Sequence, residues 1–250
     1  MKNGFFKNLR KIEFSVTNAC TGRCKHCSQG AHSGRCLRLD PLIAANTVRE
    51  VASVFRIETV MVFGGEPLLH RSAVYSIMNV ANSLEVPKRQ VITNGFFTRN
   101  TDEICQVAAQ LAECGVNDLL LSVDAFHQET IPINIVKCFA KEVKKCGIPV
   151  RISPAWLVGI NDDNLYNRQT RLLLDYFCDI DIPVGDGNIV FPEGNALKYL
   201  AEYFRGELPK NPYVNDPRDI HCISVSPDGG VLNGNIYSKA IMEIIRDYEP

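Results

Sequence analysis

The chain has 250 residues, and its 27 lysines and arginines nearly balance its 28 aspartates and glutamates, which gives a net charge of −1. A chain of this length can bury the core of one large α/β domain. Its charge balance gives no electrostatic footprint for nucleic acid or an anionic membrane. No apolar stretch approaches the ~20 residues that a membrane span requires, and the N-terminal segment lacks the apolar core of a signal peptide. We therefore expect neither a nucleic acid nor a membrane as a partner.

The chain contains ten cysteines, enough in principle for a set of disulfides. Small secreted proteins that depend on disulfides are much shorter and poorer in core residues than this chain, of which 46% is hydrophobic. We therefore expect reduced thiols and a cytoplasmic location.

From residue 11 onward, short apolar runs alternate with longer amphipathic stretches, which is typical of βαβ units and a parallel sheet. Asp40 and Pro41 supply a helix cap and a first-turn proline, and Gly115 and Gly147 stop two further helices. Thr101 is the expected start of the helix that Gly115 ends. The predicted strands cover residues 11–17, 59–63, 90–93, 118–124, 150–158 and 188–191. The predicted helices cover residues 41–55, 72–84, 101–114, 130–146, 165–178 and 196–204.

Six strand–helix units predict an α/β fold, a partial (β/α)6 TIM-like barrel, because a closed TIM barrel needs eight such units. In parallel sheets of this kind, ligands bind at the carboxyl ends of the strands. A motif that directly follows a strand is therefore a better candidate for a site than one within it.

The polar, proline-containing segment 206–219 is the plausible domain boundary of the chain. It divides a barrel core, residues 1–205, from a short C-terminal extension, residues 206–250. In this extension, residues 222–226 and 231–232 predict a β-hairpin around the turn Ser226-Pro227-Asp228-Gly229. Residues 238–248 predict a closing helix.

Cys20, Cys24 and Cys27 follow the first predicted strand with the spacing C-x3-C-x2-C. Three thiolates in one short loop can hold three corners of a [4Fe–4S] cluster and leave the fourth iron open to a substrate. The alternatives are a zinc site and three unrelated core thiols. Structural zinc normally takes four protein ligands, and a residue adjacent to Cys27, such as His26, rarely reaches the same metal. The spacing therefore favours chemistry at iron.

Together with Gly64-Gly65-Glu66-Pro67 after the second strand, the cysteine motif resembles that of the radical S-adenosylmethionine (radical SAM) superfamily. The resemblance covers roughly residues 11–196 and implies oxidoreductase chemistry with a [4Fe–4S] cluster and S-adenosyl-L-methionine as cofactors. In that family the open iron chelates S-adenosylmethionine, and the reduced cluster cleaves it to methionine and a 5′-deoxyadenosyl radical that abstracts hydrogen from the substrate. An electron donor of the flavodoxin or ferredoxin type is then an expected partner.

The resemblance also implies which residues contact the cofactors. The glycine motif holds the amino group of S-adenosylmethionine through backbone oxygens and Glu66, and Ser122-Val123-Asp124 matches the S-x-D pattern near its ribose and carboxylate. The resemblance further implies that His26 packs on the cluster and that the segment around Trp156 packs on adenine. The expected iron ligands, which are also the catalytic residues, are Cys20, Cys24 and Cys27. The expected cofactor contacts are His26, Gly64, Gly65, Glu66, Pro67, Asn94, Ser122, Asp124 and Trp156.

Several of these motifs also occur without any cofactor. Gly64-Gly65 is typical of an ordinary strand-to-helix turn, and Asn94-Gly95, which resembles the T-N-G of the family, is also a generic turn. His127 and Glu129 are expected to be exposed loop residues. Asn195 stands where the family has an arginine, which leaves the basic contact at that position open.

The segment from Cys222 onward resembles a degenerate or truncated SPASM-like extension, a feature of peptide-modifying members of the superfamily. Residues 232–235 lack the cysteines that would hold an auxiliary cluster, so no such cluster is expected. Cys36 and Cys222 are instead candidate thiols near the substrate.

This tail favours a peptide or protein substrate, with a small metabolite as the alternative. The ten-residue N-terminal arm is too short for a leader-peptide-binding domain, so a peptide would need direct contact or a separate recognition protein. A hypothesis of another class is a non-catalytic iron–sulfur binding or scaffold protein, supported by Asn195 and by the missing auxiliary cysteines. The intact cysteine and glycine motifs favour the enzyme.

Overall fold

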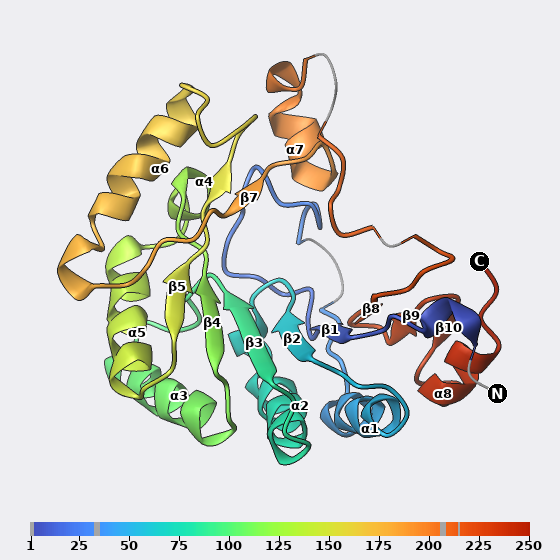
Figure 1. Ribbon diagram of the computed structural model, residues 1–250. Coiled ribbons are helices and arrows are strands. Elements are labelled where there is room, and N and C mark those ends of the chain that lie inside the picture. Colours follow the sequence, from blue (N-terminus) through green and yellow to red (C-terminus); the bar gives the residue numbers. More distant parts are fainter. Residues whose placement is uncertain (1–2, 33–35, 206–208, 215) are drawn as a thin grey trace.

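The computed structural model describes residues 3–32, 36–205, 209–214 and 216–250. Its centre is a six-stranded sheet with the strand order β5-β4-β3-β2-β1-β8, in which all neighbours run parallel (Figure 1). The strands are β1 Lys11–Ser15, β2 Thr59–Phe63, β3 Lys88–Thr93, β4 Asp118–Leu121, β5 Val150–Ile152 and β8 Cys222–Val225. The sheet is open, with β5 and β8 at its edges, so the predicted α/β partial barrel is confirmed.

The long helices that follow β1, β2, β3 and β4 along the chain pack on one face of the sheet (Figure 1). The long helices of the chain are α1 Pro41–Ala52, α2 Arg71–Ser83, α3 Thr101–Glu113, α5 Ile133–Lys145 and α6 Leu165–Asp175. The short ones are α4 Ala125–Gln128, α7 Gly194–Tyr199 and α8 Ile241–Arg246. Four 3₁₀ turns complete the described helical structure: η1 Gly4–Phe6, η2 Pro67–His70, η3 Cys178–Ile180 and η4 Ala201–Tyr203. None of the helices in the described residues is long and apolar enough to cross a membrane.

Local capping explains where these helices begin and end. The Asp40 carboxylate accepts hydrogen bonds from the backbone N–H groups of Leu42 and Ile43, at 2.9 and 3.0 Å, so α1 starts as predicted. Helix α3 is capped one residue earlier than expected, because the side chain of Asn100 accepts from Asp102 N. Gly115, with a φ of +85°, follows the end of α3 in the left-handed conformation that glycine adopts without strain.

The two faces of the sheet differ in chemistry. On the face toward the helices the strand side chains are apolar and fully buried, for example Ile12, Val62 and Leu119. Alternate residues of the same strands point to the opposite, inner face. That inner face carries a polar set: Lys11, Glu13, Gln90, Asp118, Arg151, Cys222 and Ser224. The apolar face forms the core, and the polar face lies on the side where a partial barrel binds its ligands.

The sixth strand of the sheet is not the predicted one. Residues 188–191 supply only the short strand β7, Asn188–Ile189, which pairs with β6, Ala155–Trp156, in a separate two-stranded sheet. The predicted strand 150–158 divides into β5 and β6 because Pro154, which has no N–H to donate, interrupts it. The strand that pairs with the free edge of β1 is instead β8. In this parallel pairing Lys11 lies opposite Cys222 and Phe14 lies opposite Val225.

The predicted hairpin of the extension is also wrong in its pairing. Residues 222–225 pair with β1, whereas β9, Gly230–Val231, pairs with β10, Gly234–Asn235. The turn itself is confirmed, because Gly229 N donates to Ser226 O at 2.9 Å. The division of the chain at residue 206 falls on residues 206–208, which lie outside the described part, and it stays a prediction.

We predict that β8 is an integral part of the domain. Replacing Ile223, which is fully buried, by alanine is expected to lower the free energy of unfolding by about 2–5 kcal/mol, because the cavity opens beside β1 in the main core. Ser224→Ala, on the opposite face of the same strand, is the matched control and is expected to change stability by less than about 0.5 kcal/mol. Urea titration measures both. Equal stabilities of the two variants would contradict an integral β8.

Candidate functional site

Three cysteines of the loop between β1 and α1 share one cavity. Cys20, Cys24 and Cys27 all line a space of about 750 Å³ that extends over the inner face of the sheet. Each of them is a free thiol, with Cys24 buried and the other two partly buried. The three sulfur ligands predicted from the spacing are therefore brought together at the carboxyl end of β1.

Burial raises the pKa of all three thiols. The pKa of Cys20 rises to about 11, and those of Cys24 and Cys27 rise as well, mainly because the cavity wall removes the thiolates from water. In the metal-free protein the three sulfurs thus carry protons at neutral pH. A metal that binds here has to displace these protons, so its binding is coupled to proton release.

The cysteine loop is fastened to the end of β2 by glycine backbone. Gly65 N donates to Thr17 O at 2.8 Å, and Glu66 N donates to Ala19 O at 2.8 Å. A Cβ atom on Gly64 would lie 2.6 Å from Thr17 O, and one on Gly65 would lie 2.2 Å from Ala19 O. No side chain fits between the two segments, so these two positions require glycine for a structural reason.

Glu66 connects β2 to β3 rather than facing the cavity. Its fully buried carboxylate accepts hydrogen bonds from Leu68 N at 3.0 Å, Thr93 Oγ1 at 2.7 Å and Asn94 N at 2.9 Å. Burial raises its pKa to about 7, although these three donors act in the opposite direction. Gly64 and Gly65 line the cavity, whereas Glu66 and Pro67 do not. The predicted contact of Glu66 with a cofactor amino group stays a prediction.

Asn94 lies directly against the cysteine loop. Its Nδ2 is 3.6 Å from Cys20 Sγ and donates to Thr21 Oγ1 at 3.2 Å, while its Oδ1 accepts from Phe96 N at 2.8 Å. Because Glu66 holds the backbone of Asn94, the end of β2 fixes the amide that touches Cys20. Asn94 thus lines the same cavity as the cysteines, and its predicted contact with a cofactor stays a prediction.

Ser122 and Asp124 have different environments. Ser122 is partly exposed and lines the cavity, and within the described residues no hydrogen bond of its hydroxyl group is found. Asp124 is fully buried, and its carboxylate accepts from Phe126 N and His127 N at 3.0 Å and from Ala155 N at 3.1 Å. It therefore acts as the cap of α4, and its predicted contact with the cofactor stays a prediction.

His127 was expected in an exposed loop, and this expectation is wrong. Its side chain is only 16% exposed, and Nδ1 lies 2.8 Å from Asp124 Oδ2. Burial opposes ionisation of Asp124, but the interaction with His127 outweighs it and lowers the pKa of Asp124 to about 2. Glu129 is exposed, as expected, and forms an ion pair of 2.8 Å with Lys25 of the cysteine loop.

Two further histidines lie beside the cysteines. His26 packs against Phe126 with a ring distance of 4.8 Å, and burial lowers the pKa of His26 to about 4, so the ring is neutral. His32, which no sequence motif indicated, has Nδ1 2.8 Å from Asn18 O and Nε2 3.5 Å from Cys27 Sγ. Its place five residues after Cys27, in the same loop, is the pattern that could have revealed it.

A second contact holds the cysteine loop from the opposite side. Asn195 N donates to Cys27 O at 2.9 Å, and Asn195 Nδ2 donates to Cys24 O at 3.1 Å. A Cβ atom on Gly194 would lie 2.4 Å from Ser28 O. Asn195, which replaces the arginine of the resembled motif, thus stabilises the loop through its amide.

Trp156 is buried but does not line the cavity. Its indole nitrogen donates to Asp186 O at 2.8 Å, and the guanidinium group of Arg171 lies 5.7 Å from its ring. Pro154 and Ala155 of the same segment do line the cavity. The predicted contact of Trp156 with adenine therefore stays a prediction.

The inner face of the sheet forms a charged wall of the same cavity, to which Lys11, Glu13 and Arg151 contribute. Lys11 pairs with Glu13 on β1, and Arg151 pairs with Asp118 at 3.1 Å. The carboxylate of Asp118 also pairs with Lys88, at 3.0 Å, so it is shared by two cations. A cavity with soft sulfur ligands at one end and paired charges at the other suits an iron–sulfur group next to a polar substrate.

The donor set fits a [4Fe–4S] cluster with one open iron. Three cysteine sulfurs meet in one cavity, and the described part of the chain offers no fourth cysteine to it. Cys36 is exposed, and Cys222 is partly buried on the inner face without lining the cavity. The residues that could hold the cluster are therefore Cys20, Cys24 and Cys27, and Gly64, Gly65 and Ser122 line the same cavity.

The sequence was compared with models of known protein families, and one of these models matches more than half of the chain. Residues 14–163 match the family model described as the Radical SAM superfamily. A curated relative, the GTP 3′,8-cyclase of Rhodobacter capsulatus, is 26% identical over 208 residues, which are 78% of this chain and 58% of that protein. The chain spans about half the length of several other curated relatives with that name.

Two solved structures share the fold over 96% of the chain. Native anSMEcpe with bound AdoMet matches with a TM-score of 0.63, 15% identity and 81% of its own length covered. Streptococcus suis SuiB bound to its precursor peptide SuiA matches with a TM-score of 0.60, 12% identity and 65% of its length covered. Identities this low show the shared architecture alone.

We predict that Gly65→Ala displaces the cysteine loop. The added methyl group would meet Ala19 O at 2.2 Å, so the variant is expected to lose about 1–3 kcal/mol of stability and to bind less iron after anaerobic reconstitution. Gly159→Ala, where the added atom meets nothing within 4 Å, is the matched control. Thermal unfolding and iron analysis measure both effects. Full iron content in Gly65→Ala would show that this contact does not position the cysteines.

Proposed function

Because the chain belongs to the radical SAM superfamily, we propose that it is an enzyme that acts on a small polar metabolite bound against the charged wall of its cavity. The observation that carries this proposal is that one cavity of about 750 Å³ joins the three cysteines to Lys11, Glu13 and Arg151. A volume of this size accommodates one small molecule beside a bound cofactor.

The family's cofactors are a [4Fe–4S] cluster and S-adenosylmethionine, which together supply a radical that removes a hydrogen atom from the substrate. Cys20, Cys24 and Cys27 would hold three irons of the cluster. The backbone of Gly64 and Gly65 forms the adjoining wall without side chains, so a ligand can approach it closely. Ser122 offers a hydroxyl group to a bound molecule from the end of β4.

The protein's own residues keep the reaction region rigid. Asn94 Nδ2 lies 3.6 Å from Cys20 Sγ, and the Asn195 amide binds the carbonyl of Cys24. The Lys25–Glu129 ion pair, at 2.8 Å, closes the outer side of the loop and is partly exposed. These contacts come from three different segments, and together they hold the cysteine loop in place.

Two observations favour a small molecule over the peptide that the tail suggested. The first strand of that tail is β8, which pairs with β1 in the main sheet. The tail is therefore not a separate cap over the cavity, and it no longer favours a peptide substrate. The name of the curated relatives specifies GTP, a small molecule with many charged groups, and the charged inner wall of this chain suits such a ligand. SuiB binds a peptide, but its 12% identity supports only the fold.

We place the enzyme in the cytoplasm, supplied with electrons by a donor of the flavodoxin or ferredoxin type. All the cysteines in the structure are free thiols, which suits a reducing compartment. Reduction of a [4Fe–4S] cluster needs a one-electron donor, and a small flavin or iron–sulfur protein supplies such electrons.

We predict that the anaerobically reconstituted protein forms 5′-deoxyadenosine from S-adenosylmethionine after reduction with dithionite. Cys24→Ala removes an iron ligand and is expected to reduce this product to background, measured by mass spectrometry. Cys178→Ala, which removes an exposed thiol far along the chain, is the matched control and is expected to retain the activity. A wild-type protein that binds the cluster but never forms the product would support the scaffold hypothesis instead.

We predict that small molecules, rather than peptides, stimulate this reaction. The ultrafiltrate of a cell extract is treated with protease to remove peptides, and GTP is tested separately as a defined probe. The protease-treated ultrafiltrate is expected to raise 5′-deoxyadenosine formation above that of the enzyme alone. Stimulation that disappears after protease treatment would overturn the small-metabolite proposal and restore the peptide.

A further inference from the structure

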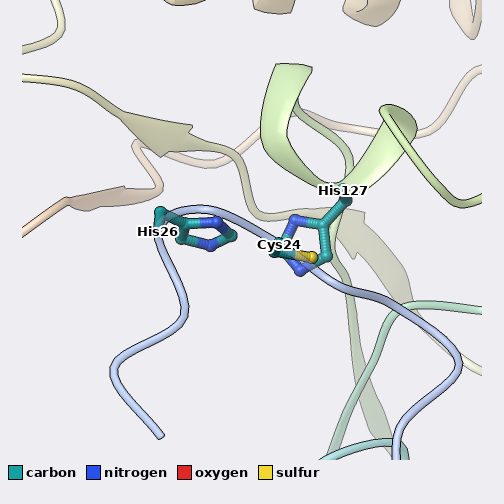
Figure 2. A group of neighbouring side chains, drawn as sticks. All are labelled: Cys24, His26 and His127. Atoms are coloured by element: carbon teal, nitrogen blue, oxygen red, sulfur yellow. The ribbon is translucent and has the colours of Figure 1, made fainter. Parts of the chain in front are cut away.

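A second set of metal-binding side chains lies beside the three cysteines. One ligand atom each from Cys24, His26 and His127 lies within 4.8 Å of the other two. Figure 2 shows the set: Cys24 and His26 come from the cysteine loop, and His127 comes from α4. This set uses only one of the three cysteines, so it differs from the site proposed for the cluster.

His127 is oriented as a metal ligand usually is. Its Nδ1 lies 2.8 Å from Asp124 Oδ2, and the ionised carboxylate of Asp124 can only accept, so Nδ1 carries the hydrogen. In the neutral ring the other nitrogen, Nε2, then has a free lone pair. Histidines that bind metals almost always donate their second ring N–H to a carboxylate or carbonyl group in this way. Asp124 is itself fixed by Phe126 N and Ala155 N, at 3.0 and 3.1 Å.

His26 supplies an independent observation. Its Nδ1 is shut off from solvent and has no hydrogen-bond partner in the part of the chain that the structure describes. The ring is held between Phe126 and His127, each with a ring distance of 4.8 Å. A buried polar atom without a partner is costly and rare in folded proteins, so this nitrogen indicates a position that binds a ligand.

We propose that, in the protein without its cluster, Cys24, His26 and His127 bind a single divalent cation of the zinc class. One thiolate and two imidazoles suit Zn²⁺ and its neighbours in the first transition series, and a water molecule would complete a tetrahedron. Bonds of about 2.0–2.3 Å to one ion place ligand atoms roughly 3.5 Å apart, so the set contracts by about 1 Å on binding. On binding, the thiol proton of Cys24 is released and the sulfur–metal bond forms.

This site and the cluster exclude each other, because both require the sulfur of Cys24. Cys20 and Cys27 belong only to the cluster, and the two histidine nitrogens belong only to the single ion. A zinc ion bound here therefore blocks cluster assembly until it is removed. The inference goes beyond the proposed function and does not depend on which substrate the enzyme takes.

The test is an anaerobic titration of the metal-free protein with Co²⁺, which reports its ligands through its absorption spectrum. Wild type is expected to show thiolate-to-cobalt charge transfer and the intense visible bands of tetrahedral cobalt. His26→Phe retains a ring against Phe126 but removes both nitrogens, and it is expected to weaken cobalt binding at least about tenfold. His127→Ala is expected to do the same, with circular dichroism showing that both variants are folded.

Cys20→Ala and Cys27→Ala are the matched controls. They are expected to bind cobalt as tightly as wild type, although each loses the iron–sulfur cluster on reconstitution. A site made by the three cysteines would give the reverse pattern, with binding lost in Cys20→Ala and retained in His26→Phe, and would overturn the proposal. A wild type that binds no cobalt would overturn it too. Cluster formation measured on the same proteins keeps this failure distinct from failure of the proposed enzyme.

A kinetic consequence gives a second readout. Zinc added before iron and sulfide is expected to slow cluster assembly in wild type, measured by the growth of the visible cluster absorption. In His26→Phe the same addition is expected to have less effect, because the competing site lacks a ligand. Equal slowing in both proteins would contradict the site.

Discussion

The site depends on the close approach of two backbones at the ends of β1 and β2. Gly64 and Gly65 lie so near to Thr17 and Ala19 that no Cβ atom fits, and two hydrogen bonds of 2.8 Å fix this approach. From there the next residue, Glu66, reaches across to β3 and orients the amide that touches the first cysteine. A buried carboxylate with three donors is stable only if all three stay in place, so this connection is rigid.

The opposite side of the cysteine loop is fixed in a similar way by a distant segment. Gly194 lies against Ser28 O, and Asn195 donates to the carbonyl groups of Cys24 and Cys27. Residues 18–32 of the loop contain no helix or strand, yet the carbonyl groups of the loop are bound from two directions. Backbone hydrogen bonds from both sides thus help to hold the loop that brings the three thiols to one cavity.

Local patterns in the sequence were sufficient for most of the helices and strands, and they singled out three cysteines that the fold brings to one cavity, but they did not predict contacts between distant residues. Helix α1 and the first four strands follow from apolar periodicity, a capping aspartate and glycine stops. The pairing of β8 with β1 joins residues more than 200 positions apart, and no local pattern reports which edge of a sheet such a strand takes. The same limit applies to His127, because its environment depends on the buried carboxylate of Asp124. Both polar residues of the S-x-D pattern line the cavity, and the carboxylate of Asp124 also caps α4, while their contact with a cofactor stays a prediction.

The shared sulfur of Cys24 makes the outcome of metal loading depend on which ligands are available. A cluster places three thiolates around iron and sulfide, whereas the single ion uses one thiolate and two neutral imidazoles. Thiolates are softer than imidazoles, so iron with sulfide favours the three-cysteine arrangement, and zinc without sulfide is satisfied by the mixed set. Asp124 stabilises only the mixed set directly, because it holds the ring of His127. Asp124, which caps α4, therefore also favours binding of the single zinc-class ion. Cluster assembly has to displace that ion before the cavity can bind S-adenosylmethionine.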